Sequence, residues 1–169
     1  MKKLFVCILA LLFALTACAV AEEAPALTET AAQGDGYTIA YDATAFAFYR
    51  DGVIEGTDLL VPTQDAVSPV YLLVSRVEDV QAEVDSFTGE NYTDAGGTVL
   101  ASGLHARTFT LEREAVGYTA YIVENGDDAW CILCVCAQQE EAYAQRLLDV
   151  ANTFAPAPEA TPAATAVQE

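Results

Sequence analysis

Apolar and polar residues alternate with a period of two through much of the central chain, a spacing typical of β-strands. In the segment YTIAY, the side chains of Tyr37, Ile39 and Tyr41 share one face. Phe46 and Phe48 repeat the same spacing a few residues later. On this basis the first part of the chain is predicted to contain strands at residues 37–41, 46–48, 59–61 and 70–77.

The period then changes to that of a helix. Val80, Val84 and Phe87 fall at i, i+4 and i+7 in the segment 78–87, so they form one apolar helical face. The pair Gly96-Gly97 predicts a break in the chain after this helix. Beyond the break, the apolar runs predict strands at residues 99–101 and 104–111, on either side of Gly103.

A hairpin is predicted where two apolar runs flank Asn125-Gly126-Asp127-Asp128, because Asn-Gly between alternating segments is a strong turn signal. Both faces of this hairpin are apolar, so we expect a central position with both sides covered. The predicted faces are Trp130, Ile132, Cys134 and Cys136 with Thr119, Tyr121 and Val123, against Cys131, Leu133 and Val135 with Tyr118, Ala120 and Ile122. We expect Trp130 to pack near Tyr121 or Val123.

A second helix is predicted at residues 139–154, where Tyr143, Leu147, Val150 and Phe154 lie on one face. The order of strands, helix, strands and helix, with hairpins between strands, favours the α+β class: a mainly antiparallel β-sheet packed with two helices. We expect a single domain at residues 37–154, long enough to bury its own core.

This order of elements resembles that of the PsbP-like fold, which also occurs in short bacterial lipoproteins. The resemblance rests on GYTIAYDATAFAF, VYLLVSRV, GYTAYIVENGDDAWCILCVC and EEAYAQRLLDVANTF, and it covers about residues 36–154. Members often carry a proline soon after the first strand, whereas this chain has Asp42-Ala43 there. The resemblance implies a binding or accessory role, and it transfers no functional residue.

The first 21 residues predict an export signal, because Lys2 and Lys3 precede a long apolar run that ends in small residues. A membrane-spanning helix is the alternative, since the uncharged run reaches Ala21. The sequence Leu-Thr-Ala-Cys ending at Cys18 resembles a bacterial lipobox, so we expect lipidation of Cys18 and anchoring to the membrane. Cleavage after Ala21, which would release a secreted protein, is the rival.

Two flanking segments lack an apolar period. Residues 22–36 are rich in Ala, Thr and Glu, and they are predicted to be a flexible linker. Residues 155–169 consist mostly of Ala, Pro and Thr, and they are predicted to be a disordered tail.

The chain is strongly acidic, with a formal net charge of −18 at pH 7. Such a field disfavours nucleic acid as a partner, and it disfavours contact with an anionic membrane other than through the lipid anchor. It suits solubility, and it also suits a cationic partner or Ca²⁺.

Three cysteines fall within six residues at Cys131, Cys134 and Cys136, which raises the possibility of metal or redox chemistry. Neighbours three apart on a strand point to opposite faces, so Cys131 and Cys134 do not share a site. The sequence has no second cysteine pair, and no histidines spaced for zinc. We therefore interpret the three cysteines as buried apolar side chains, and we expect no metal and no cofactor.

Few other residues suggest chemistry. His105, the single histidine, is the candidate for an unrecognised catalytic site. Asp51, Glu55 and Asp58 offer oxygens for Ca²⁺ without the spacing of an EF-hand loop. Tyr49, beside Arg50, is a candidate for a surface contact.

The sequence therefore predicts an exported, lipid-anchored and non-enzymatic binding or accessory module of the cell envelope. Its partner would be an envelope protein or a small ligand. An extracytoplasmic enzyme built on His105, the acidic residues or a thiol is the alternative.

Overall fold

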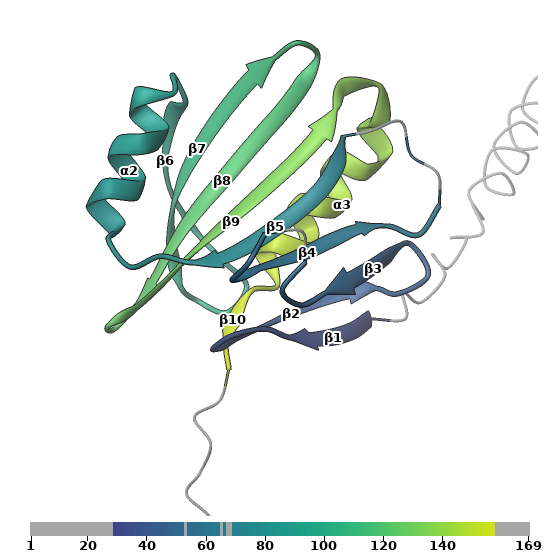
Figure 1. Cartoon of the computed structure of the whole chain (residues 1–169), viewed down its shortest axis with the longest axis horizontal. Helices are drawn as coiled ribbons and strands as arrows, with labels where there is room; N and C mark the ends of the chain where they lie inside the picture. Colours follow the sequence, from purple (N-terminus) through teal and green to yellow (C-terminus); the bar gives the residue numbers. More distant parts are fainter. Residues whose placement is uncertain (1–28, 53, 65, 67–68, 158–169) are drawn as a thin grey trace, which may run out of the picture.

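The computed structural model describes residues 29–157, with gaps at 53, 65 and 67–68. The large sheet of this region comprises Phe46–Tyr49 (β3), Thr57–Pro62 (β4), Val70–Arg76 (β5), Thr93–Val99 (β6), His105–Arg113 (β7), Val116–Asn125 (β8) and Asp128–Ala137 (β9). The strands lie in the order β3-β4-β5-β9-β8-β7-β6, and every neighbouring pair is antiparallel (Figure 1). With one helix on each face, the domain confirms the predicted α+β class.

The β8–β9 hairpin forms as predicted, and it closes with a two-residue loop. Asn125 pairs with Asp128, which leaves Gly126 and Asp127 in the turn. Gly126 has φ +64°, a conformation that glycine adopts without steric cost. Because Trp130 pairs with Val123 and Cys134 with Thr119, the predicted division of residues between the two faces is confirmed.

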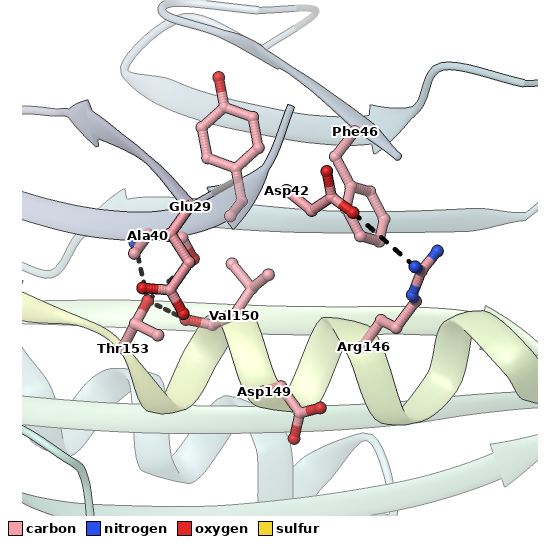
Figure 2. Close-up of a pocket in the computed structure, with 9 residues that line it drawn as sticks. Glu29, Ala40, Asp42, Phe46, Arg146, Asp149, Val150 and Thr153 are labelled. Carbon is pink, nitrogen blue, oxygen red and sulfur yellow. Dashed lines mark hydrogen bonds and ion pairs between the residues drawn. The ribbon is translucent and has the colours of Figure 1, made fainter. Parts of the chain in front are cut away.

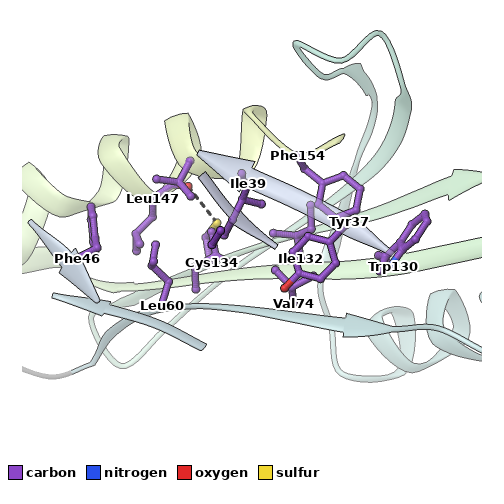
Figure 3. Close-up of a cluster of buried hydrophobic side chains, with 14 of the residues drawn as sticks. Tyr37, Ile39, Phe46, Leu60, Val74, Trp130, Ile132, Cys134, Leu147 and Phe154 are labelled. Carbon is purple, nitrogen blue, oxygen red and sulfur yellow. Dashed lines mark hydrogen bonds between the residues drawn. The ribbon is translucent and has the colours of Figure 1, made fainter. Parts of the chain in front are cut away.

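One face of the large sheet, here called the inner face, is covered by Glu141–Asn152 (α3) and by a small antiparallel sheet. A short 3₁₀ turn, Gln138–Glu140 (η1), leads from β9 into α3. The small sheet comprises Glu29–Gln33 (β1), Tyr37–Asp42 (β2) and Ala155–Pro156 (β10), in the order β1-β2-β10. The main core lies between these layers (Figure 3).

Aromatic rings tie the two sheets together within this core. Phe154, just after α3, stacks on Tyr37 of β2, with ring centroids 5.2 Å apart. It also meets Trp130 of β9 edge-on at 5.4 Å. The indole N–H of Trp130 donates a hydrogen bond to the backbone oxygen of Asp35 at 3.1 Å. The predicted neighbourhood of Trp130 and Val123 is present too, since the two residues are a cross-strand pair.

The opposite face, here called the outer face, carries Val80–Gly89 (α2). The carboxylate of Asp79 caps this helix by accepting a hydrogen bond from the backbone N–H of Ala82 at 3.0 Å. Val84 and Phe87 are buried on the helix face that packs against the sheet. Beneath α2 lies a second core cluster, which includes Phe109, Ala120, Ile122 and Cys131.

The predicted break at Gly96-Gly97 is wrong, because both glycines lie within edge strand β6. The register with β7 shifts between Asp94 and Gly96, and Gly96 has φ +89°. Glycine here allows a β-bulge rather than ending the strand. The strand expected at 99–101 is also wrong, because β6 already ends at Val99 and a turn follows.

The boundaries predicted for the linker and the tail are also partly wrong. Glu29–Gln33 is strand β1 and Ala155–Pro156 is strand β10, and both pair with β2. Their residues are small or polar, so these strands are held by backbone hydrogen bonds more than by side-chain burial. The predicted export signal, Cys18 and residues 158–169 lie outside the described residues. Within the described part, no helix is long and apolar enough to cross a membrane.

Candidate functional site

The three cysteines are free thiols in the central strand β9, and the structure divides them between the two faces. Burial raises the pKa of the Cys131 thiol to about 12 and also raises the pKa values of Cys134 and Cys136. All three are therefore protonated at neutral pH, whereas nucleophilic thiol chemistry needs the thiolate. The thiol of Cys134 lies 3.6 Å from the backbone oxygen of Leu147, consistent with a packing role.

His105 lies at the exposed start of β7, paired with Val99 of the edge strand. The register places it two strands and two residues away from Cys131, which corresponds to about 12 Å. The structure therefore does not bring the histidine to a thiol as a Cys-His catalytic pair would require.

The three acidic residues named as candidate Ca²⁺ ligands do not form one site, because they differ in burial and in hydrogen bonding. Asp58 is buried, and its carboxylate accepts hydrogen bonds from the Tyr37 hydroxyl and the Asp51 backbone N–H. Asp51 and Glu55 are exposed. Among the described residues, no group of three or more suitable side chains could hold a metal ion.

Hollows flank α3 on both of its sides. The one between β2 and α3 encloses about 80 Å³ (Figure 2). Arg146 forms an ion pair with Asp42 there at 3.8 Å, and hydrogen bonds from Thr44 lower the pKa of the Asp42 carboxyl. Thr153 exchanges hydrogen bonds with the backbone of Ala40. These contacts join the small sheet to the helix, so we interpret this hollow as a structural seam.

On the other side of α3, two hollows of about 310 and 230 Å³ meet at Leu148. Their walls mix apolar side chains with hydroxyl, amide and carboxylate groups, including Thr119, Tyr121 and Gln145. Burial raises the pKa of Tyr121 to about 12, so its hydroxyl stays neutral. The wall of the larger hollow also includes Cys134 and Cys136, with Glu112 and Glu141. Burial raises the pKa of both thiols, so neither is a thiolate at neutral pH.

The outer face is covered by α2 over only part of its width. Beside α2, a band of apolar side chains crosses five adjacent strands. The band, here called the outer apolar strip, consists of Tyr49 (β3), Leu59 and Val61 (β4), Tyr71 and Leu73 (β5), Leu133 (β9) and Tyr118 (β8). The prediction that β9 is covered on both faces is therefore only partly right.

Strand register makes the strip continuous. Tyr49 pairs with Leu59, Leu59 with Leu73 and Leu73 with Leu133, which forms one row across four strands. In the neighbouring row, Tyr71 and Tyr118 flank the fully buried Val135. Residues directly opposite one another in a sheet share a face, so both rows point outward beside α2.

The strip is partly accessible to solvent. Tyr49 is 53% exposed, and Ile54, in the turn before β4, is 57% exposed. The other six side chains of the strip are half-buried. A hollow of about 260 Å³ is lined by Ile54, Thr57 and four residues of the strip, which are Leu59, Val61, Tyr71 and Leu73. Apolar side chains that stay partly accessible and contiguous make the strip a candidate interaction surface.

Sequence reasoning named one residue of the strip, Tyr49, as a candidate for a surface contact, and the structure shows it 53% exposed. It missed Leu59, Val61, Leu73 and Leu133, which a period-two pattern assigns to a core. The length of α2 could have revealed the uncovered surface, because a ten-residue helix is about 15 Å long and covers only part of a seven-stranded sheet.

No family model and no curated protein matches the chain. A crystal structure of a protein from Bacteroides thetaiotaomicron VPI-5482 is similar, with a TM-score of 0.49 and 14% sequence identity. The match covers 78% of this chain and 48% of the other, so this chain spans about half the length of that protein. The PsbP-like relationship stays a prediction.

Proposed function

We propose that this protein is a non-enzymatic binding module of the cell envelope, exported and anchored by lipid on Cys18, that docks a partner protein on the outer apolar strip. The observation that carries the proposal is the strip itself. It lies on a seven-stranded sheet, and cores of protein interfaces are built from such aromatic and aliphatic groups.

The candidates for catalysis favour the same conclusion. The thiols are buried with raised pKa values, and His105 is displaced from them by two strands. Export is supported by Lys2 and Lys3 before the apolar run, and anchoring by the lipobox-like sequence ending at Cys18. A diacyl anchor provides two chains, which is enough for stable attachment to a membrane.

Site-specific photo-crosslinking in intact cells tests the docking surface. A benzophenone amino acid at position 71, within the strip, should give discrete crosslinked protein bands. The same probe at the exposed position 93 of β6 should give none of those bands. Equal patterns from the two positions would contradict docking on the strip.

The anchor is tested separately, on the mature protein. Mass spectrometry should show a diacylated N-terminal Cys18, and Cys18→Ala should move the protein out of the membrane fraction. A free N-terminus at Glu22 would replace the lipoprotein by a secreted form and leave the docking proposal intact.

A further inference from the structure

We infer that the partner presents an amphipathic helix to the outer apolar strip, with its apolar side on the sheet and lysine or arginine on its solvent side. This inference rests on the proposed function and names the chemistry of the partner. It follows from the size of the strip, from the way α2 covers the adjoining surface, and from the charge of the domain.

The size of the strip suits one helix. Five adjacent strands are separated by four intervals of about 4.8 Å, so the strip is about 19 Å long. A helix of about 13 residues has that length, and its diameter of about 10 Å matches the two side-chain rows. The strip then offers on the order of 200 Å², well below the roughly 800 Å² per partner of a standard protein interface. Any partner would need additional surface to reach a standard interface, so this area suits a weak, transient contact with one helix and not a stable dimer.

Helix α2 shows how this sheet accepts a helix. Its buried residues Val84 and Phe87 lie at i and i+3, and they pack on the sheet beside the strip. Phe87 stacks on Phe109 of β7 at 5.3 Å. After the helix, Tyr92 meets Tyr118, the end residue of the strip, at 6.3 Å. The strip therefore begins where the cover provided by α2 ends, and a partner helix would extend the same layer.

Charge decides which helix would bind. The formal net charge is −18, and in the loop that carries Ile54 the exposed Asp51 and Glu55 outnumber the exposed Arg50. A helix whose solvent side carries lysine or arginine is attracted by this field, whereas a second copy or an anionic bilayer is repelled. The flanking segments of this chain are poor occupants, because residues 22–28 and 158–169 contain just Leu27 and Val167 as large apolar side chains.

Binding of a defined peptide to the mature protein tests the inference. The probe is a fluorescein-labelled 18-residue peptide of leucine and lysine, with leucine at helical i, i+3, i+4 and i+7 spacing. We expect saturable binding by fluorescence anisotropy, and we expect the circular dichroism of the mixture to report gained helix. A peptide of the same composition with the leucines dispersed around the helix should bind at least about tenfold more weakly, a difference of about 1.4 kcal/mol.

Variants of the protein separate docking from simple charge attraction. Leu73→Asp, at the centre of the strip, should weaken binding about tenfold or more, although it makes the domain more negative. Thr93→Asp adds the same charge on the exposed edge strand β6 and should change affinity less than twofold. Because Leu73→Asp could disturb folding, Ile54→Asp at a 57% exposed position serves as the second variant, with a loss of at least about threefold expected.

Four results would overturn the inference. Equal or tighter binding by both Leu73→Asp and Ile54→Asp would show that the peptide binds through charge alone. Binding of liposomes of a zwitterionic or anionic lipid that depends on Leu73 would assign the strip to a membrane. A dimer seen by light scattering and abolished by Ile54→Asp would assign it to a second copy. If the peptide does not bind but position 71 still gives discrete crosslinks, a helical partner is excluded and the proposed docking function is retained.

Discussion

The hydroxyl of Tyr37 donates a hydrogen bond to the buried carboxylate of Asp58, with 2.6 Å between Oη and Oδ2. This bond joins β2 of the small sheet to β4 of the large one. The second carboxylate oxygen accepts a hydrogen bond from the backbone N–H of Asp51 at 3.1 Å. A buried carboxylate is costly unless its hydrogen-bonding capacity is filled, so the pair fixes how the two sheets meet.

Removing this hydroxyl should therefore destabilise the domain. Tyr37→Phe keeps the ring that stacks on Phe154 but leaves Asp58 one donor short, and we expect a loss of about 1–3 kcal/mol in the free energy of unfolding. Urea denaturation measures the loss. Tyr41→Phe, on the same strand at a half-buried position, is the matched control and should cost less. Equal losses in the two variants would mean that the hydrogen bond to Asp58 adds nothing to the free energy of unfolding.

The same junction depends on a glycine. A Cβ added at Gly34 would lie 2.5 Å from Asp58 Oδ2 and closer still to the Tyr37 ring. Overpacking of a well-packed core costs about 1–3 kcal/mol, so Gly34→Ala should lower the urea midpoint clearly. Gly89→Ala, at the end of α2 where no atom lies within 4 Å of the added Cβ, should leave the midpoint unchanged or raise it. Similar midpoints for both variants would contradict the close packing.

The periodic parts of the chain were predictable, and the parts held by backbone or by loop geometry were not. The β8–β9 hairpin followed from Asn125-Gly126 between alternating runs, and its facial division is as predicted, whereas the two-residue loop that sets its register was not predicted. In contrast, β1 and β10 consist of small and polar residues whose pairing with β2 leaves no hydrophobic period. The pair Gly96-Gly97 predicted a break because glycine suits a break and a β-bulge equally well.

The candidate site was only partly predictable, for a different physical reason. A continuous apolar run indicates that both faces of a strand are apolar, but it does not indicate what covers each face. Leu72 and Leu73 have the same local pattern, yet Leu72 is 1% exposed under α3 and the small sheet while Leu73 lies in the open strip. Which face stays open depends on where α2 ends, which is decided by tertiary packing.

Buried thiols should make the stability of the domain depend on alkaline pH. The folded state raises the pKa of Cys131 to about 12 and also raises that of Cys134, above the ordinary thiol value of about 8.5. The folded state thus binds these protons more tightly than the unfolded state. The stabilisation is fully present below about pH 8.5, and it is lost progressively as the pH rises toward the folded-state values.

Two measurements check this expectation. The free energy of unfolding should fall between pH 8.5 and 11, and the fall should be smaller in the Cys131→Ala/Cys134→Ala double variant, compared with its own value at pH 7. At pH 8 in the native state, Cys131 and Cys134 should resist iodoacetamide for hours, and both should react at once in 8 M urea. Rapid labelling of either thiol in the native protein would contradict the burial and revive the thiol-enzyme alternative.

The adjacent leucines Leu72 and Leu73 offer the most direct test of the open strip. The same truncation on opposite faces of β5 should have unequal costs. Leu72→Ala should lose about 2–5 kcal/mol of folding free energy, because it leaves a cavity in the main core. Leu73→Ala should lose about 1 kcal/mol, because its side chain stays partly in water when folded. Urea denaturation with a shared m-value gives the loss of folding free energy for each variant. In Leu73→Ala, crosslinking from position 71 should be lost while the domain remains folded. Costs of equal size would mean that the outer face is covered at Leu73, and the strip would then be core rather than a docking surface.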